Sequence, residues 1–233
     1  MKKKLIIFYI FSMVILVTAC NKDDYILGGS IEDTGRYKNM TTYEVLKTMP
    51  LYDTLVQLID AAGVADKINA ANTTFFAPND YSIFSYLNKR TLFVQNTIGA
   101  DKRFGLDSLK YYLTNNINGT KDSLLMYLIN TPLNYDVLTN TGAYFNSGLP
   151  GNRVIVSYEY TRDPNLGYNP LVSTVPRVVY YTFLWEPYDL NDSNPASDVP
   201  NDVGIRTLVK LSGLQTKNGI LNGLESSHTL LFY

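Results

Sequence analysis

The residue whose type and setting most clearly point to chemistry is Cys20, the only cysteine in the chain of 233 residues. It follows the small and apolar run Leu16–Ala19, which looks like a bacterial lipobox, in which a thiol accepts diacylglycerol before the preceding peptide bond is cleaved. Before this run come a basic start, Met1–Lys4, and a mostly apolar stretch, Leu5–Val17. As a helix that stretch would rise about 20 Å, short of the roughly 30 Å hydrocarbon core, so it favours a signal peptide over a membrane span. We therefore predict a lipoprotein signal peptide at 1–19 and lipidation of Cys20.

The residues after Cys20 suggest where the anchored protein resides. Lys22, Asp23 and Asp24 resemble the export tails of surface-displayed Gram-negative lipoproteins, although a solvated linker would tolerate the same charges. Glycines and mixed charge without periodicity continue to about residue 40, so 20–40 is interpreted as the lipidated cysteine with a flexible tether. The expected location is the outer membrane, lipid-anchored and facing the cell exterior.

Other residue constellations that support catalysis or cofactor binding are sparse. The one histidine, His228, is the only residue around which a Ser–His–Asp set could form, and its place beside a predicted strand favours a structural role. The sequence holds no Walker loop, HExxH or GxGxxG pattern, and its acidic loops match no EF-hand spacing. With 20 basic and 21 acidic residues the net charge is -1, which argues against nucleic-acid binding. We expect no enzyme activity, no cofactor and no metal.

Tyrosine is abundant, with 19 Tyr against 10 Phe and one Trp. Aromatic side chains with a polar tip suit sugar rings and protein interfaces, but alternating tyrosines also fill ordinary strand positions. The candidate ligand-binding residues in this aromatic-rich stretch are Tyr168, Tyr181, Trp185 and Tyr188. Packing within the sheet is the alternative for each of them.

The first half of the chain has mainly helical patterns. Thr41 and Glu44 have the spacing of a capping box, and apolar residues three and four apart continue from Leu51 to Ala62, before Gly63. A short β-rich run, Thr73–Ala77, is followed by Asp80, which is placed to cap a helix over Tyr81–Leu87. A further helix is predicted over Asp107–Asn115, and Ser123–Ile129 is compatible with helix or strand.

The second half has mainly strand patterns. Ala143–Ser147 and Arg153–Tyr160 flank a Gly/Pro-rich loop and predict a hairpin. Val175–Trp185 is a long β-rich run, and Tyr188–Gly204 is a polar loop. Three more strands are predicted over Ile205–Leu211, Gly219–Leu224 and Thr229–Tyr233, with Asn218-Gly219 as a type I′ turn. Helices first and strands later imply a single α+β domain with a mostly antiparallel or mixed sheet.

Two segments resemble the signatures of the fasciclin-like domain family. Tyr52–Gly63 followed by Thr74–Phe84 (TFFAPNDYSIF) is similar to the start of that domain, and Asn218–Glu225 with Leu230-Leu231 is similar to its second signature. The resemblance spans 41–233, with an inserted region at about 158–204. Two family histidines are replaced, since the internal Tyr-His pair is Tyr127-Leu128 here and the second signature has Asn222.

The resemblance implies N-terminal helices packed on the sheet, with Phe76 and Phe84 both facing the core. It also implies a non-enzymatic role in adhesion or in interactions with surface or extracellular proteins. The alternative is an accessory glycan-binding lipoprotein of an outer-membrane polysaccharide uptake system. In both cases the lipid anchor would make the membrane a partner.

Overall fold

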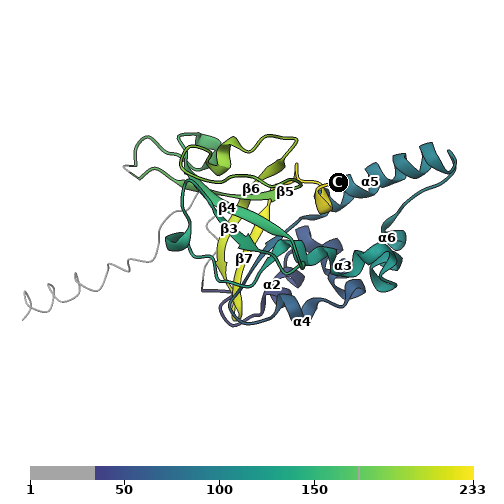
Figure 1. Ribbon diagram of the computed structural model, residues 1–233. Helices are drawn as coiled ribbons and strands as arrows, with labels where there is room; N and C mark the ends of the chain where they lie inside the picture. The colour runs from purple at the N-terminus through teal and green to yellow at the C-terminus, as the bar shows by residue number, and fades with distance from the viewer. Residues whose placement is uncertain (1–34, 173) are drawn as a thin grey trace, which may run out of the picture.

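A mixed seven-stranded sheet organises the protein in the computed structural model, which describes residues 35–172 and 174–233 (Figure 1). The strand order is β2-β1-β7-β6-β5-β4-β3, and only the pair β1 and β7 is parallel. The two ends of the sheet meet, because Ile129 of β2 forms a bridge with Ser147, directly after β3. The sheet is therefore nearly closed on itself, and the predicted α+β class is confirmed.

The elements alternate little, with helices first and most strands later. The helices are α2 (Thr42–Lys47), α3 (Asp53–Ala62), α4 (Ala65–Ile68), α5 (Asp80–Thr97) and α6 (Leu106–Thr114). The strands are β1 (Thr73–Ala77), β2 (Leu128–Ile129), β3 (Ala143–Asn146), β4 (Arg153–Tyr160), β5 (Arg177–Leu184), β6 (Gly204–Gln215) and β7 (Gly219–Leu224). The 3₁₀ segments are η1 (Pro50–Tyr52), η2 (Ile117–Tyr127), η3 (Tyr135–Val137), η4 (Pro164–Leu166), η5 (Ala196–Asp198) and η6 (Leu230–Phe232).

Local signals in the sequence account for the first helices. The Thr41 hydroxyl accepts from the Glu44 backbone N–H at 3.3 Å, and the Glu44 carboxylate accepts from the Thr41 N–H at 2.7 Å, so the predicted capping box is confirmed. Helix α3 ends at Gly63, whose φ of 64° lies in the left-handed region that favours glycine. These two helices place Leu46 and Leu55 against the sheet.

Strand β1 lies between β2 and β7, and all five of its residues are buried. Its parallel partner begins at Gly219, where a β-carbon would collide with the Thr73 backbone carbonyl, so only glycine fits there. Asn218 fastens this junction, since its Oδ1 accepts from the Thr42 N–H at 2.8 Å. The predicted type I′ turn is wrong: neither Asn218 nor Gly219 has a positive φ, and the Thr216 N–H donates to the Gly219 carbonyl instead.

The C-terminal strand prediction is also wrong. This segment instead contains the 3₁₀ turn η6 (Leu230–Phe232), with φ of 59° at Leu231 and 53° at Phe232. The turn places the Phe232 ring parallel to that of Phe183, with centroids 4.4 Å apart. The C-terminal segment therefore buries one aromatic ring against the sheet and does not have the alternating side-chain directions of a strand.

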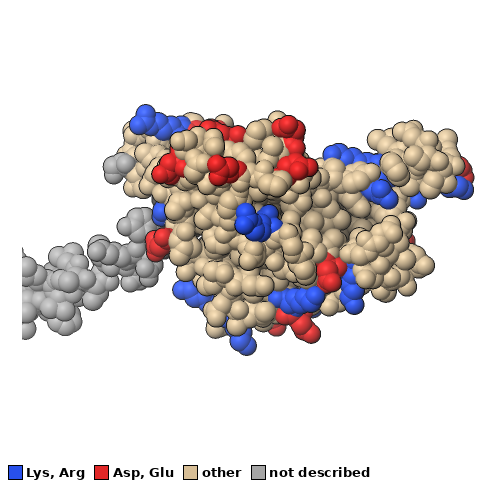
Figure 2. Space-filling model, in the orientation of Figure 1, with Lys and Arg blue, Asp and Glu red and all other residues tan. Residues whose placement is uncertain are grey.

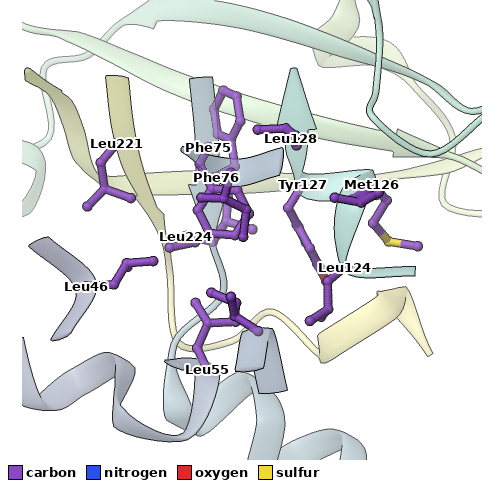
Figure 3. Packing of buried hydrophobic residues seen from close by; sticks show 14 of the residues in the cluster. Leu46, Leu55, Phe75, Phe76, Leu124, Met126, Tyr127, Leu128, Leu221 and Leu224 are labelled. Atoms are coloured by element: carbon purple, nitrogen blue, oxygen red, sulfur yellow. The ribbon is translucent and has the colours of Figure 1, made fainter. Parts of the chain in front are cut away.

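The hydrophobic core lies between the N-terminal helices and the sheet (Figure 3). Leu46 and Leu55 come from the helices, Phe76 from β1 and Leu224 from β7, and Tyr127 adds a fully buried ring. The close-up shows these side chains gathered in the space between helices and strands. The core thus joins the two halves that the sequence pattern distinguishes.

The polar loop predicted over Tyr188–Gly204 is present and folds onto the outer face of the sheet. Ala196 in η5 is fully buried, and its N–H donates to the Thr141 carbonyl at 2.8 Å. A β-carbon on Gly142 would approach that of Ala196 within 2.9 Å, which leaves space there only for glycine. The inserted loop is therefore packed structure and covers part of the sheet that a ligand could otherwise reach.

Candidate functional site

The four predicted ligand-binding aromatics do not form one site. Tyr181 is fully buried in β5, with its hydroxyl donating to the Met126 carbonyl at 2.5 Å and its ring 4.8 Å from that of Phe76. Burial raises the pKa of the Tyr181 hydroxyl well above its ordinary value. Its assignment to a binding surface is wrong, because its alternating position in β5 faces the core.

The other three residues lie at or near the surface, and each makes its own separate contacts. Trp185 is 47% exposed and makes an edge contact with the Phe183 ring at 6.0 Å. Tyr188 is half-buried and donates from its hydroxyl to the Pro195 carbonyl at 3.2 Å, and Tyr168 is half-buried in the loop after η4. Within the described residues, no ring contact joins any two of the four candidates.

A different surface, on helix α5, arises where the prediction for Phe84 fails. The N-cap of α5 is Asn79, whose Oδ1 accepts from the Ser82 N–H at 3.1 Å, and Asp80 is the first helical residue. Because each residue turns about 100° around the axis, this start directs Ile83 inward and Phe84 outward. Ile83 is 1% exposed and Phe84 is 67% exposed, so Phe76 faces the core as predicted and Phe84 does not.

The outward side of α5 carries a continuous line of uncharged residues. Tyr81, Phe84, Asn88 and Leu92 follow at intervals of three and four, which places them on one face over about 17 Å. Tyr81 is 64% exposed and Leu92 is 60% exposed. We call these four residues the α5 stripe. The spacing of these residues is visible in the sequence. The resemblance to the fasciclin-like signature, however, led to the prediction that Phe84 faces the core, so the stripe was not predicted.

Contacts beside and behind the stripe fix α5 to the rest of the protein. The Lys89 ammonium donates to the Tyr233 carbonyl at 2.7 Å, and the Thr91 hydroxyl donates to the Phe104 carbonyl at 3.1 Å. The Arg90 guanidinium lies 5.1 Å from the Phe104 ring centroid and 5.4 Å from that of Tyr233. These contacts hold the helix as it extends from the body, so the stripe is presented on a rigid support (Figure 1).

The stripe is electrically neutral, and charge lies around it. In the space-filling view the region of α5 is largely tan, with basic residues near its junction with the body (Figure 2). Asp80 lies at the buried start of the helix, where its carboxylate accepts from the Thr54 N–H at 3.0 Å. Burial raises the pKa of that carboxyl. The surface is thus suited to apolar contact and not to ion binding.

The surroundings of His228 are those of a core residue. Its Nε2 lies 2.7 Å from the Tyr127 hydroxyl, which also accepts from the Leu231 N–H at 2.8 Å. Burial lowers the pKa of His228 to about 3, so the imidazole is neutral at physiological pH. Tyr127 therefore does meet a histidine, although one from the far end of the chain and not from the adjacent position. No carboxylate among the described residues contacts this pair.

Neither a metal centre nor a membrane-spanning helix is found in the part of the chain that the structure describes. Across residues 35–172 and 174–233, no group of three His, Cys, Asp or Glu side chains is arranged to hold a metal ion. In that same part of the chain, the helices are too short or too polar to cross a bilayer. Cys20 and the segment 1–34 lie outside the described residues, so lipidation stays a prediction.

Comparison with known proteins gives a structural likeness without a sequence relative. No family model and no curated protein matches the chain. Among solved structures, the fold is similar to a FAS1 domain pair from the insect cell adhesion molecule fasciclin I, at 15% sequence identity and a TM-score of 0.44. The match covers 80% of this chain and 46% of the insect chain, so the chain spans about half of the length of that domain pair.

Proposed function

We propose that this protein is a lipid-anchored, non-enzymatic interaction protein of the cell surface that binds a partner protein through the α5 stripe. The observation that carries the proposal is the outward exposure of Tyr81, Phe84 and Leu92. Their helix is fixed to the body by contacts such as the hydrogen bond from Lys89 to the Tyr233 carbonyl. Contiguous exposed apolar side chains mark interaction sites in soluble domains. Binding at this surface would serve adhesion or assembly outside the cell.

The chemistry of the stripe indicates the kind of partner. Three turns of a helix with large apolar side chains and no charge fit the apolar groove or helix face of another protein. Aromatic residues dominate the energetics of such contacts because they desolvate a large area at low entropic cost. A strongly charged polymer would find few partners here, since the stripe holds no ionisable side chain apart from the Tyr81 phenol.

Anchoring at Cys20 and export by Lys22-Asp23-Asp24 complete the proposal. The support is in the sequence: a basic start, an apolar run and small residues before the only cysteine. Multiple acyl chains give durable attachment, which a single chain does not. The localisation proposed is the outer membrane, with the domain facing the exterior.

Glycan binding is the second candidate, supported by Trp185, which is 47% exposed at the end of β5. An exposed indole stacks well on sugar rings. Binding of the protein to a glycan array that is lost on Trp185→Ala, with folding intact, would favour this function over a protein partner. The α5 stripe variants should leave such binding unchanged.

Site-specific photo-crosslinking on intact cells tests the leading proposal. A benzophenone amino acid at Phe84 should give one discrete crosslinked protein species, because the side chain would lie within an interface. The matched control is Leu171, which is 92% exposed on a different surface and should give none. The proposal fails if positions 81, 84 and 92 all give no product while the protein is folded and displayed.

The anchor has its own test. Metabolic labelling with a fatty-acid analogue should mark the wild-type chain and not Cys20→Ala, since the sequence has no second cysteine. Label on the variant would exclude lipidation at this position. Protease treatment of intact cells should remove the wild-type domain, and replacing Lys22-Asp23-Asp24 with alanines should protect it. Equal cleavage of both would mean that these residues are only a linker.

A further inference from the structure

A cavity of about 500 Å³ opens beside the end of α2, and none of the α5 stripe residues lines it. It lies between the segment before α2, the turn η1 and the strands β6 and β7. The residues that define it best are Arg36, Met49, Leu51, Tyr52, Lys210 and Leu224. The volume is that of an ordinary small-molecule site, which typically measures about 300–1,000 Å³.

The Tyr52 side chain contributes a polar group to this cavity. The residue is only 3% exposed, but its hydroxyl is not one of the fully buried polar atoms without a hydrogen-bond partner among the described residues, so it is open to the cavity. The hydroxyl fits because position 223 is glycine, where a β-carbon would collide with it. Burial raises the pKa of Tyr52 to about 12, so the phenol keeps its proton and remains a donor. A ligand oxygen placed against this donor would form a hydrogen bond in a largely desolvated setting.

The charged residues of the wall have one sign. Among the residues that the structure describes, Arg36 and Lys210 are the charged side chains that line the cavity, and no carboxylate does. Neither cation forms an ion pair within the described part of the chain. Arg36 lies 5.2 Å from the centroid of the Tyr37 ring, a contact that leaves its N–H groups able to donate. Two cations without counter-charges favour an anionic group at this wall.

Asn79 links the cavity wall to α5 without competing for the ligand. Its Nδ2 donates to the Leu224 carbonyl at 3.3 Å and to the Ser226 hydroxyl at 3.2 Å, while its Oδ1 caps the helix. The amide is thus fully used in holding the wall in place. Thr48 and Ser226 add hydroxyl groups to the lining, and its apolar part includes Met49, Leu51 and Leu224.

We propose that this cavity binds a small amphipathic carboxylate. The carboxylate lies between Lys210 and Arg36, the Tyr52 hydroxyl donates to an oxygen of the ligand, and the apolar body packs on Leu51 and Leu224. This site is separate from the α5 stripe and does not depend on the proposed partner protein. Charge-assisted hydrogen bonds supply the selectivity for the anion, and apolar burial supplies much of the affinity.

Equilibrium dialysis with naphthoate as the probe tests the site. The full chain is held in lipid nanodiscs, with empty nanodiscs as the blank, and the neutral naphthamide serves as the comparison ligand. Naphthoate should bind at least about tenfold more tightly than naphthamide, because only the anion is held by charge-assisted bonds. Lys210→Met should weaken naphthoate binding by about tenfold and remove the preference over naphthamide. Tyr52→Phe, which removes only the hydroxyl, should weaken it by about threefold or more.

The matched control is Lys121→Met, an exposed lysine outside the cavity, which should leave binding of both probes unchanged. The proposal is overturned by equal affinity for naphthoate and naphthamide, by unchanged binding in Lys210→Met, or by no detectable binding at about 1 mM, the weak end of recognition. Loss of partner crosslinking at Phe84 with naphthoate binding intact would reject the proposed function alone.

Discussion

Strand β1 and helix α5 are joined by only Pro78 and Asn79, yet they differ completely in their relation to solvent. All five residues of β1 are buried, whereas α5 buries three of its eighteen, Ser82, Ile83 and Tyr86. The strand lies between β2 and β7 in the sheet, and the helix extends from the body (Figure 1). Two phenylalanines of one sequence signature, Phe76 and Phe84, therefore have opposite roles: one stabilises the fold and the other is free to contact a partner.

The largest effect is expected in β1. Phe76 is fully buried, with its ring 4.8 Å from that of Tyr181, so Phe76→Ala should lower the free energy of unfolding by about 3–5 kcal/mol. Chemical denaturation measures the change. A loss below about 1 kcal/mol would mean that the core does not close around this ring.

Acid should weaken the same core through His228. Its pKa is about 3 when folded, against an ordinary 6.5, so the unfolded chain binds a proton in this window that the folded chain does not. Stability is then complete above about pH 6.5 and falls by about 1.4 kcal/mol per pH unit toward pH 3. Denaturation at several pH values should show this slope in the wild type and a shallower one in His228→Gln. Identical slopes in the wild type and in His228→Gln would mean that a group other than His228 binds the proton.

The junction between the two regions should respond moderately. Asn79→Ala removes the cap of α5 and the bond to the Leu224 carbonyl, and should cost about 0.5–2 kcal/mol. Asp80→Ala should cost less, because burial disfavours that carboxylate and offsets part of what its hydrogen bonds with Thr54 and Leu55 contribute. If denaturation experiments show a larger loss of stability for Asp80→Ala than for Asn79→Ala, Asp80 would be the capping residue.

The smallest effect is expected on the outer side of α5. Phe84→Ala and Leu92→Ala should each change the free energy of unfolding by no more than about 0.5 kcal/mol, since both side chains are mostly in solvent. The measurement is the same denaturation series used for Phe76→Ala. A cost near that of Phe76→Ala would show that α5 packs against the body through this face.

Sequence patterns predicted the parts of the fold that local physics determines. The capping box at Thr41, the glycine end of α3, the buried run of β1 and the β3–β4 hairpin each depend on residues close in the chain. The α+β class follows from the order of these elements. Closure of the sheet through Ile129 and Ser147 could not be predicted, because it depends on how the two ends meet in space.

The candidate sites were harder to predict, for two physical reasons. A one-residue change in where α5 begins rotates Phe84 from the core to solvent, and Asn79 and Asp80 are both good capping residues. Tyr181 has the composition of a binding residue but sits at an inward position of β5, and only strand register decides between the two faces. The cavity at Tyr52 combines residues from distant segments, and no local pattern marks it.

The central claim, that the α5 stripe is the partner-binding surface, is tested most directly by the affinity of the partner captured by crosslinking. Titration of that partner against Phe84→Ser and Leu92→Ser, each with wild-type stability, should show binding weakened by about tenfold or more. Leu171→Ser, which changes a more exposed apolar residue elsewhere, should bind as the wild type does. Unchanged affinity in both stripe variants would contradict the account.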